Sequence, residues 1–286
     1  MRESISVIGL GLMGRPVART LAASGWAVQG WNRSPLPVDV TEGITQCRNL
    51  ADAAHAEVCL LMLADSDAVD EVLARLEPHL VAGQLVLDMG TSDPARSQVH
   101  ASRLAEKGIG WVDAPVSGGP EGAASGTLAI MAGGRQDDFA RVKPILDVLG
   151  GNVVHVGDAG MGHMVKVINQ VIVGLTIEAV AEALTLAERM GLDPRLVQQA
   201  LKGGWADSKI LQHHGTRMIA RDYQPGAHVK TQLKDLRLAQ ALADAAGVQL
   251  PHLNSTVEFY EALVAQGDVK RDHTALHKLL WSPPGR

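Results

Sequence analysis

The segment Gly9-Leu10-Gly11-Leu12-Met13-Gly14 constrains the fold of this chain more than any other stretch. It follows an apolar run, Ile5 to Ile8, that predicts a strand, and it precedes a run, Pro16 to Ala23, that predicts a helix. Glycines at these spacings allow a tight turn, let the backbone approach a pyrophosphate and allow close packing of helix on strand. The alternative is a glycine turn with a purely structural role. The context favours a dinucleotide site contacted by all six residues.

The rest of the chain predicts an α/β fold in two parts. In the first part short apolar runs alternate with helical patterns, which predicts a Rossmann-like, doubly wound domain built on a parallel sheet. From about Gly160 onward only helical patterns remain, so we expect an all-α C-terminal domain, joined to the first by a long interdomain helix. We place the domains at residues 1–161 and 162–286. The expected strands are 5–8, 27–31, 57–63, 85–88 and 111–113, and the expected helices are 16–23, 66–76, 94–106, 163–190, 193–202, 205–220, 228–246, 252–266 and 273–280.

Charge and composition exclude several classes of protein. The net charge is −5 and the basic residues are dispersed, which argues against a nucleic-acid surface. Cys47 and Cys59 have no metal-ligand spacing, which is typical of a reducing compartment. The apolar stretch from Val165 to Leu186 contains charged and amide side chains that a lipid-spanning helix rarely carries. We therefore expect a soluble, cytoplasmic protein that binds neither nucleic acid nor membrane.

The end of the second expected strand bears on the choice of dinucleotide. An NAD-specific fold usually places an acid there to bind the ribose 2′-hydroxyl. Here the chain has Asn32, Arg33 and Ser34, so a 2′-phosphate meets no repulsion and Arg33 offers a charge-assisted contact. The alternative is that Arg33 is an ordinary surface arginine. The pattern favours NADP(H) over NAD(H), with these three residues at the cofactor.

A second motif, Asp113-Ala114-Pro115-Val116-Ser117-Gly118-Gly119-Pro120, follows an expected strand. The consecutive backbone N–H groups of Ser117, Gly118 and Gly119 can form a concavity for an anion, and the Ser117 hydroxyl adds a donor. Such a loop suits a substrate carboxylate. A tight left-handed turn without a ligand explains the same composition equally well.

A third motif lies at the start of the long helix. At about 100° per residue, Lys166 and Asn169 share one side of it, while Ile168, Ile172, Leu175 and Ala179 fall on another. A lysine is a poor base at neutral pH unless partial burial beside a cationic nicotinamide lowers its pKa. With a lowered pKa, Lys166 can exchange the hydroxyl proton during hydride transfer. From the spacing alone, a solvated lysine is the competing interpretation.

Together these motifs resemble the β-hydroxyacid dehydrogenases, the family of 3-hydroxyisobutyrate dehydrogenase and tartronate semialdehyde reductase. Lys234-Asp235-Leu236 adds a fourth motif in the family's order. The resemblance implies Lys166 as the catalytic acid/base, Asn169 with the Ser117-Gly118-Gly119 loop as substrate-positioning residues, and Lys234 near the nicotinamide. It also implies Thr91 as a cofactor contact.

Departures from the family pattern affect the cofactor loops. The usual pair of hydroxyl residues is Gly90-Thr91 here, and the loop after the third expected strand reads Leu63-Ala64-Asp65, where we still place Leu63 and Ala64 at the cofactor. Asn169-Gln170 looks more like the tartronate semialdehyde reductase branch, whereas Arg33 looks more like the NADPH-dependent short-chain semialdehyde reductases. The Asn169-Gln170 pair and Arg33 therefore indicate different substrates.

Trp205 and the histidines complete the candidates. Trp205 is expected to form a wall of the substrate pocket, although a buried core tryptophan is an equal alternative. The histidines, among them His163 and the pair His213-His214, have no paired spacing with acids, so no metal is expected.

The expected function is interconversion of a small 3-hydroxy acid and its semialdehyde or oxo acid by an NADP(H)-preferring oxidoreductase. The partner is a small carboxylate substrate, and the protein is expected to form a homodimer or homotetramer. Two alternatives stay open: an imine reductase, against which Lys166 argues because that related group usually has aspartate or tyrosine there, and a non-catalytic dinucleotide-binding module.

Overall fold

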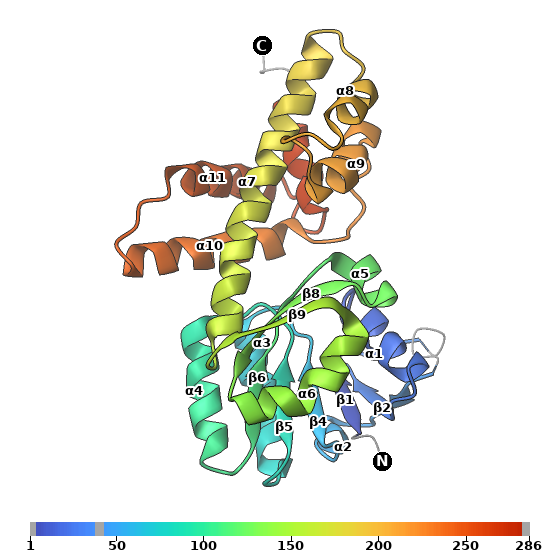
Figure 1. Cartoon of the computed structure of the whole chain (residues 1–286), viewed down its shortest axis with the longest axis vertical. Helices are drawn as coiled ribbons and strands as arrows, with labels where there is room; N and C mark the ends of the chain where they lie inside the picture. The colour runs from blue at the N-terminus through green and yellow to red at the C-terminus, as the bar shows by residue number, and fades with distance from the viewer. Residues whose placement is uncertain (1–3, 38–42, 282–286) are drawn as a thin grey trace. The chain divides into compact units, whose positions relative to one another are not determined.

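The computed structural model describes residues 4–37 and 43–281, which pack as two compact units, Met1–Lys166 and Val167–Arg286 (Figure 1). One continuous helix, α7 (Met161–Arg189), contains the boundary between them. Both the expected domain boundary after residue 161 and the observed division after Lys166 fall within this helix. The expected boundary stays a prediction.

A mixed sheet forms the centre of the first unit. Its strands follow the order β3-β2-β1-β4-β5-β6-β8-β7, and β9 pairs with β8. The strands are β1 (Ile5–Ile8), β2 (Val28–Trp31), β3 (Thr45–Gln46), β4 (Val58–Leu61), β5 (Leu85–Asp88), β6 (Gly110–Asp113), β7 (Val116–Ser117), β8 (Leu128–Gly134) and β9 (Gly150–Gly157). All pairings from β3 to β6 are parallel, which confirms the expected Rossmann-like domain.

The sheet is not parallel throughout, because β8 runs antiparallel to both β6 and β7. The connection from β7 to β8 contains only the short helix α5 (Gly119–Ser125). A parallel crossover needs a dozen or more residues to return the chain to the other end of the sheet. The chain therefore turns back directly, so β8 is antiparallel to both β6 and β7 at this edge.

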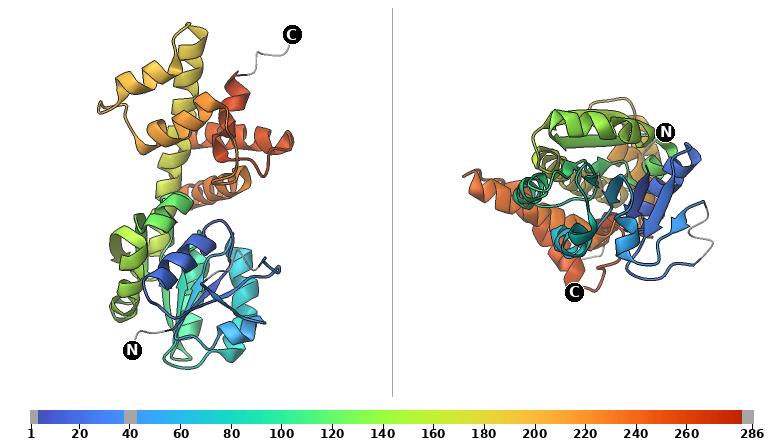
Figure 2. Two further views of the ribbon diagram at one scale, coloured as in Figure 1. Left: turned by 90° about the vertical axis from the view of Figure 1, so that its right-hand side faces the viewer. Right: turned by 90° about the horizontal axis from the view of Figure 1, so that it is seen from below.

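Helices cover both faces of this sheet (Figure 2). Successive residues of the buried strands point to opposite faces, as the two-residue period of a strand requires. Leu85 and Leu87 pack into the core under α1 (Gly14–Ala23) and α6 (Gln136–Leu149). Val86 packs into the core under α2 (Leu50–Ala53), α3 (Ser66–Leu76) and α4 (Pro94–Ala105). The continuous apolar run of β4, Val58–Leu61, follows from this burial on two faces.

The helices and strands named among the described residues of the second unit are all helices, which confirms the expected all-α part. Its elements after α7 are α8 (Pro194–Leu201), the π-helical turn η3 (Ile210–His214), α9 (Gly215–Ala220), α10 (Val229–Ala245), α11 (Pro251–Ala265), the 3-10 turn η4 (His273–Leu276) and α12 (His277–Trp281). The expected helix start at residue 205 is wrong. Asp207 accepts a bond from the Gly203 N–H at 2.8 Å and the Ser208 hydroxyl accepts one from the Leu211 N–H at 2.9 Å, so polar side chains hold a turn there.

Helix α7 is long and apolar enough to cross a membrane by length and composition alone, but 44% of its most apolar window is buried inside the protein. Ile177, Ala181 and Leu184 belong to the core of the second unit. A core helix of a soluble protein has these properties.

Candidate functional site

The predicted cofactor residues of the first unit lie at one edge of its sheet. They follow the carboxyl ends of the parallel strands β1, β2, β4 and β5, and β1 lies between β2 and β4 in the sheet. The chain order therefore reverses beside β1, and such a switch point is where open α/β sheets bind ligands. The structure brings together at this edge Gly9 to Gly14, Asn32 to Ser34, Leu63, Ala64 and Thr91.

The three glycines of the first turn have different surroundings. A Cβ at Gly9 would lie 2.4 Å from the Met62 carbonyl oxygen, and one at Gly14 would lie 1.8 Å from the Gly9 carbonyl oxygen. Gly9 also has a φ of +101°, which favours glycine. A Cβ at Gly11, in contrast, would meet nothing within 4 Å. The outer glycines are required by packing within the protein, whereas the space beside the middle one is open, and its use by a pyrophosphate stays a prediction.

Asn32 joins the glycine turn to the end of β2. Its side-chain oxygen accepts a hydrogen bond from the Leu10 N–H at 3.0 Å, and its amide donates to the Ser34 carbonyl at 2.9 Å. Arg33 is exposed over 77% of its side chain, and its guanidinium lies 3.7 Å from the Glu71 carboxylate. The predicted 2′-phosphate contact therefore has a competing acid beside it.

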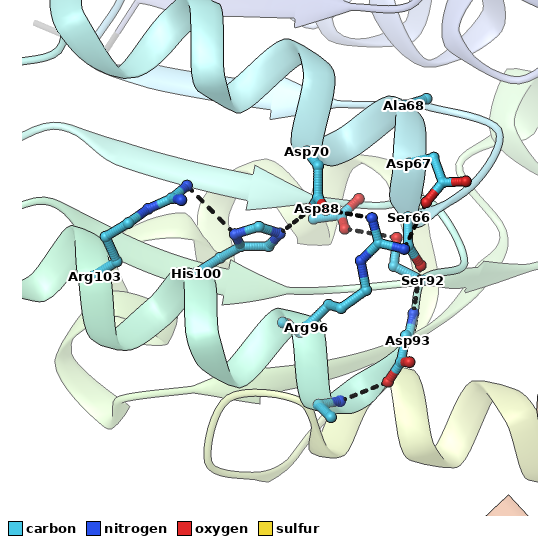
Figure 3. A network of polar contacts seen from close by, with 12 residues as sticks. Ser66, Asp67, Ala68, Asp70, Asp88, Ser92, Asp93, Arg96, His100 and Arg103 are labelled. Atoms are coloured by element: carbon cyan, nitrogen blue, oxygen red, sulfur yellow. Dashed lines mark hydrogen bonds and ion pairs between the residues drawn. The ribbon is translucent and has the colours of Figure 1, made fainter.

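The loops after β4 and β5 are bonded to each other (Figure 3). The Ser66 hydroxyl accepts a hydrogen bond from the Asp93 N–H at 2.8 Å. A Cβ at Gly90 would lie 2.8 Å from the Leu63 carbonyl oxygen. This close approach favours glycine at position 90 in this chain.

A network of charged side chains holds α3 and α4, the helices that follow these loops, against each other (Figure 3). Arg96 on α4 donates to Asp67 at 2.7 Å and also contacts Asp70. His100 lies 2.7 Å from Asp70, and burial lowers its pKa although the Asp70 charge opposes that shift. The contacts between α3 and α4 thus also hold the loops after β4 and β5, which lead into these two helices.

The Ser117 loop has the backbone of a glycine turn. Gly118 has a φ of +134° and Gly119 a φ of +67°, so both positions favour glycine. The Glu121 carboxylate lies 3.1 Å from where a Gly119 Cβ would be, which places an acid beside the predicted carboxylate site. The left-handed turn is confirmed, and the role of Ser117, Gly118 and Gly119 in substrate binding stays a prediction.

Lys166 lies in the second turn of α7 and is only 7% exposed, so a solvated lysine, the competing interpretation, is wrong. Asn169 follows it at the i, i+3 spacing that makes residues neighbours on a helix. Ile168 and Ile172, on another side of α7, are 54% and 62% exposed. Lys166 is thus turned into the protein, whereas Ile168 and Ile172 are turned outward.

In the second unit a hydrogen-bonded chain connects Asn169 with Lys234. The Asn169 amide donates to the Gln170 side chain at 2.9 Å, and the Gln170 amide donates to Asp235 at 2.6 Å. Lys234 pairs with the same carboxylate group at 2.8 Å. Two predicted site residues from distant parts of the sequence are therefore brought together through two buried side chains, Gln170 and Asp235, that sequence reasoning left without a role.

Trp205 is fully exposed, with a relative accessibility of 107%. It lies in the turn before η3. The alternative of a buried core tryptophan is wrong, and a role in the pocket wall stays a prediction.

Sequence reasoning also assigned no role to Asp88, Asp113 and His163, which are fully buried together. Asp88 ends β5 and Asp113 ends β6, and the two residues are register partners on these adjacent strands. An acid as the last residue of two neighbouring strands was the available signal, because side chains at the carboxyl ends of parallel strands gather at one edge.

One group of described residues has metal-like spacing: His214, Asp272 and His273 have ligand atoms within 4.8 Å of one another. Asp272, however, accepts hydrogen bonds from Arg217 at 2.9 Å and from the Thr274 hydroxyl at 2.7 Å. It also accepts two from backbone N–H groups of the loop before α10. A carboxylate with this many donors has a structural explanation, and the expectation of no metal stays a prediction.

His214 makes the stability of the second unit depend on pH. Burial lowers its pKa to about 3, so the folded protein keeps it neutral while the unfolded chain protonates it below about 6.5. Its contribution to stability is therefore complete above that pH and is lost as the pH falls toward 3, by up to about 1.4 kcal/mol per pH unit. We expect His214→Leu to flatten the fall in unfolding free energy between pH 6.5 and 4.5, measured by urea unfolding, with His213→Leu as the exposed-histidine control. Equal slopes in wild type and His214→Leu would contradict this.

Comparison with known proteins agrees with this arrangement. Residues 4–157 match the family described as the NAD binding domain of 6-phosphogluconate dehydrogenase, and residues 160–280 match the NAD-binding family of NADP-dependent 3-hydroxyisobutyrate dehydrogenase. The chain is 38% identical to 2-hydroxy-3-oxopropionate reductase of Escherichia coli, over 96% of each chain. It is 32% identical to NAD-dependent L-serine dehydrogenase of Pseudomonas aeruginosa, over 99% of this chain and all of that one.

Among solved structures, the crystal structure of 3-hydroxyisobutyrate dehydrogenase from Salmonella typhimurium is similar with a TM-score of 0.89 and 28% identity, covering 97% of this chain and 99% of that one. Relatives and fold thus agree over nearly the whole length. The chain belongs to the β-hydroxyacid dehydrogenase family and is an NAD(P)-dependent oxidoreductase.

Proposed function

We propose that this protein reduces a short semialdehyde that carries a carboxylate to the corresponding 3-hydroxy acid, with NADPH as the preferred cofactor. The observation that carries the proposal lies within the first unit. The open glycine turn at Gly11 and the buried Lys166 belong to the same compact unit, which provides both a dinucleotide site and an acid.

The chain's own residues supply the proton and the orientation. When bound, NADPH supplies a hydride to the carbonyl carbon of the substrate. Lys166 donates a proton to the carbonyl oxygen, so that hydride and proton together convert the carbonyl into an alcohol. Asn169, held through Gln170, orients the substrate beside Lys166. The Ser117 loop binds the carboxylate through its N–H groups and hydroxyl.

The substrate class follows from the relatives and the motifs. One relative is named for 2-hydroxy-3-oxopropionate, which is tartronate semialdehyde, and the pair Asn169-Gln170 resembles that branch. We therefore place three- and four-carbon semialdehyde acids first among the candidates.

The test is NADPH oxidation, followed by the loss of the absorbance of reduced nicotinamide, with a panel of short semialdehydes and 2- or 3-oxo acids. We expect turnover with at least one semialdehyde acid and none with cyclic imines. Cofactor binding without turnover on any acid would favour a non-catalytic module, and turnover on imines alone would favour an imine reductase.

The preference for NADPH rests on Arg33. Because a hydrogen bond to a charged group contributes about 1.5–3 kcal/mol, Arg33→Ala should lower kcat/KM with NADPH by roughly 10- to 100-fold and leave NADH nearly unchanged. Glu71→Gln removes the acid that lies 3.7 Å from Arg33 and should raise kcat/KM with NADPH. Steady-state kinetics with both cofactors measures this. A wild-type enzyme that is more efficient with NADH would refute the preference.

We infer that the protein is cytoplasmic and forms a homodimer or homotetramer through α7. Exposed apolar side chains follow one another along this helix at spacings of three, four or seven residues, namely Ile168, Ile172, Ala179, Ala183 and Leu186. Such a seam is typical of helices that pack against a partner. Ile172→Glu should convert the oligomer to a smaller species in sedimentation equilibrium, with Lys143→Ala, an exposed position on α6, as the control. A monomeric wild type would refute the inference.

A further inference from the structure

His163 is a fully buried histidine in the first turn of α7. Its ring lies between two carboxylates that are fully buried as well. Nε2 is 3.5 Å from an Asp88 oxygen, and Nδ1 is 3.9 Å from an Asp113 oxygen. All three residues belong to the first unit.

Asp113 holds the start of α7. One of its carboxylate oxygens accepts a hydrogen bond from the Gly160 N–H at 2.7 Å, and the other accepts one from the His163 N–H at 2.9 Å. A Cβ at Gly162 would lie only 2.5 Å from the Asp113 carbonyl oxygen. The first turn of α7 is therefore fixed against the end of β6 by hydrogen bonds and by close backbone packing.

Asp88 holds the loop after β5 in the same way. It accepts hydrogen bonds from the Gly90 N–H at 3.0 Å and from the Ser92 hydroxyl at 3.2 Å. Thr91, the predicted cofactor contact, lies between these two residues. The carboxylate on one side of His163 thus holds the proposed cofactor loop, and the carboxylate on the other side holds the helix of Lys166.

We propose that His163 is a positioning residue that couples the loop Gly90 to Ser92 to the first turn of α7 and so sets the place of Lys166. The inference rests on the proposed function, because it assigns roles to Thr91 and Lys166. His163 touches neither substrate nor cofactor in this proposal. It acts through Asp88 and Asp113.

The physical basis is the burial of two acids side by side. Burial raises the pKa of Asp113, and the charge of His163 opposes that rise. An imidazole between the two carboxylates offsets the cost of burying them, which is high without a partner. Lys166 is the i, i+3 neighbour of His163, so displacement of the first turn displaces the lysine. A misplacement of about 1 Å at a reacting group can lower the rate by roughly 10²-fold.

The kinetic test compares His163→Leu with His163→Gln, which keeps a polar side chain. We expect His163→Leu to lower kcat by roughly 10- to 100-fold, His163→Gln to lower it less, and the KM for NADPH to change by less than about threefold in both. His277→Leu is the matched control, because His277 is also a fully buried histidine, and its ring lies 3.1 Å from the Tyr223 hydroxyl, outside the proposed site. It should lower Tm and leave kcat nearly unchanged. A His163→Leu variant that loses Tm but keeps kcat would overturn the proposal.

A second readout needs no turnover. Hydrogen exchange by mass spectrometry reports the protection of residues 158–166 with and without NADPH. In the wild type, NADPH should slow exchange in this segment and in the loop at residues 88–93; in His163→Leu only the loop should respond. If the wild type binds NADPH but turns over no substrate, the proposed function fails and this measurement still decides the coupling. Equal protection of residues 158–166 in both proteins would refute the role of His163.

Discussion

Replacing Lys166 by alanine should lower kcat by roughly 10²- to 10⁴-fold, because general acid catalysis by a positioned side chain is worth about that much. The side chain is only 7% exposed, so water cannot readily replace its proton donor. NADPH affinity should stay near the wild-type value, since the glycine turn and Arg33 are unchanged. Stopped-flow measurement of NADPH oxidation and fluorescence titration of NADPH give the two quantities separately.

The matched variants separate charge from proton transfer. Lys166→Arg keeps a positive charge, but arginine is not deprotonated in proteins and makes a poor acid, so this variant should be nearly as slow as alanine. Lys143→Ala removes a surface lysine that pairs with Asp147 at 2.6 Å and should turn over like the wild type. A Lys166→Ala enzyme within about threefold of wild-type kcat would remove Lys166 from the mechanism.

Helices and strands were predicted correctly where the spacing of apolar residues along the sequence matches the side of the element that is buried. The strand Leu85–Asp88 and the helix Ser66–Leu76 have the expected bounds, because the strand is buried on both faces and an N-terminal acid caps the helix. For the segment between β6 and α7, the sequence predicted no helices or strands. Its strand β8 (Leu128–Gly134) contains two alanines and two glycines, which have weak strand propensity, and α6 contains Pro144. Pairing with neighbouring strands makes β8 form, and burial of its apolar side makes α6 form, rather than local preference.

The candidate site was predictable where it depends on local backbone. The glycines of the first turn and of the Ser-Gly-Gly loop predict a backbone with positive φ angles. The structure has such angles at Gly9, Gly118 and Gly119. The pairs of polar side chains that contact each other in the site could not be predicted from the sequence. Gln170 and Asp235 are 65 residues apart in the sequence, and Asp113 and His163 are 50 apart, so only the fold brings them together.

Alanine substitutions in the glycine turn should have the second large effect, on stability at position 14 and on NADPH affinity at position 11. A Cβ at position 14 would lie 1.8 Å from the Gly9 carbonyl oxygen, so Gly14→Ala must displace backbone. Overpacking of this kind costs about 1–3 kcal/mol and occasionally more. A Cβ at position 11 meets nothing within 4 Å, so Gly11→Ala should change the unfolding free energy by less than about 0.5 kcal/mol. The same methyl group would occupy the space that we assign to the pyrophosphate, and the Kd for NADPH should rise at least about tenfold.

The pair therefore distinguishes a glycine required by the protein from one required by its ligand. Urea unfolding and NADPH titration of both variants give the four values. We expect Gly14→Ala to lose stability and, through the displaced turn, cofactor affinity as well, while Gly11→Ala loses affinity alone. If Gly11→Ala binds NADPH like the wild type, the added methyl group does not meet the pyrophosphate. The pyrophosphate would then bind elsewhere, because no protein atom lies close enough to position 11 to require glycine there.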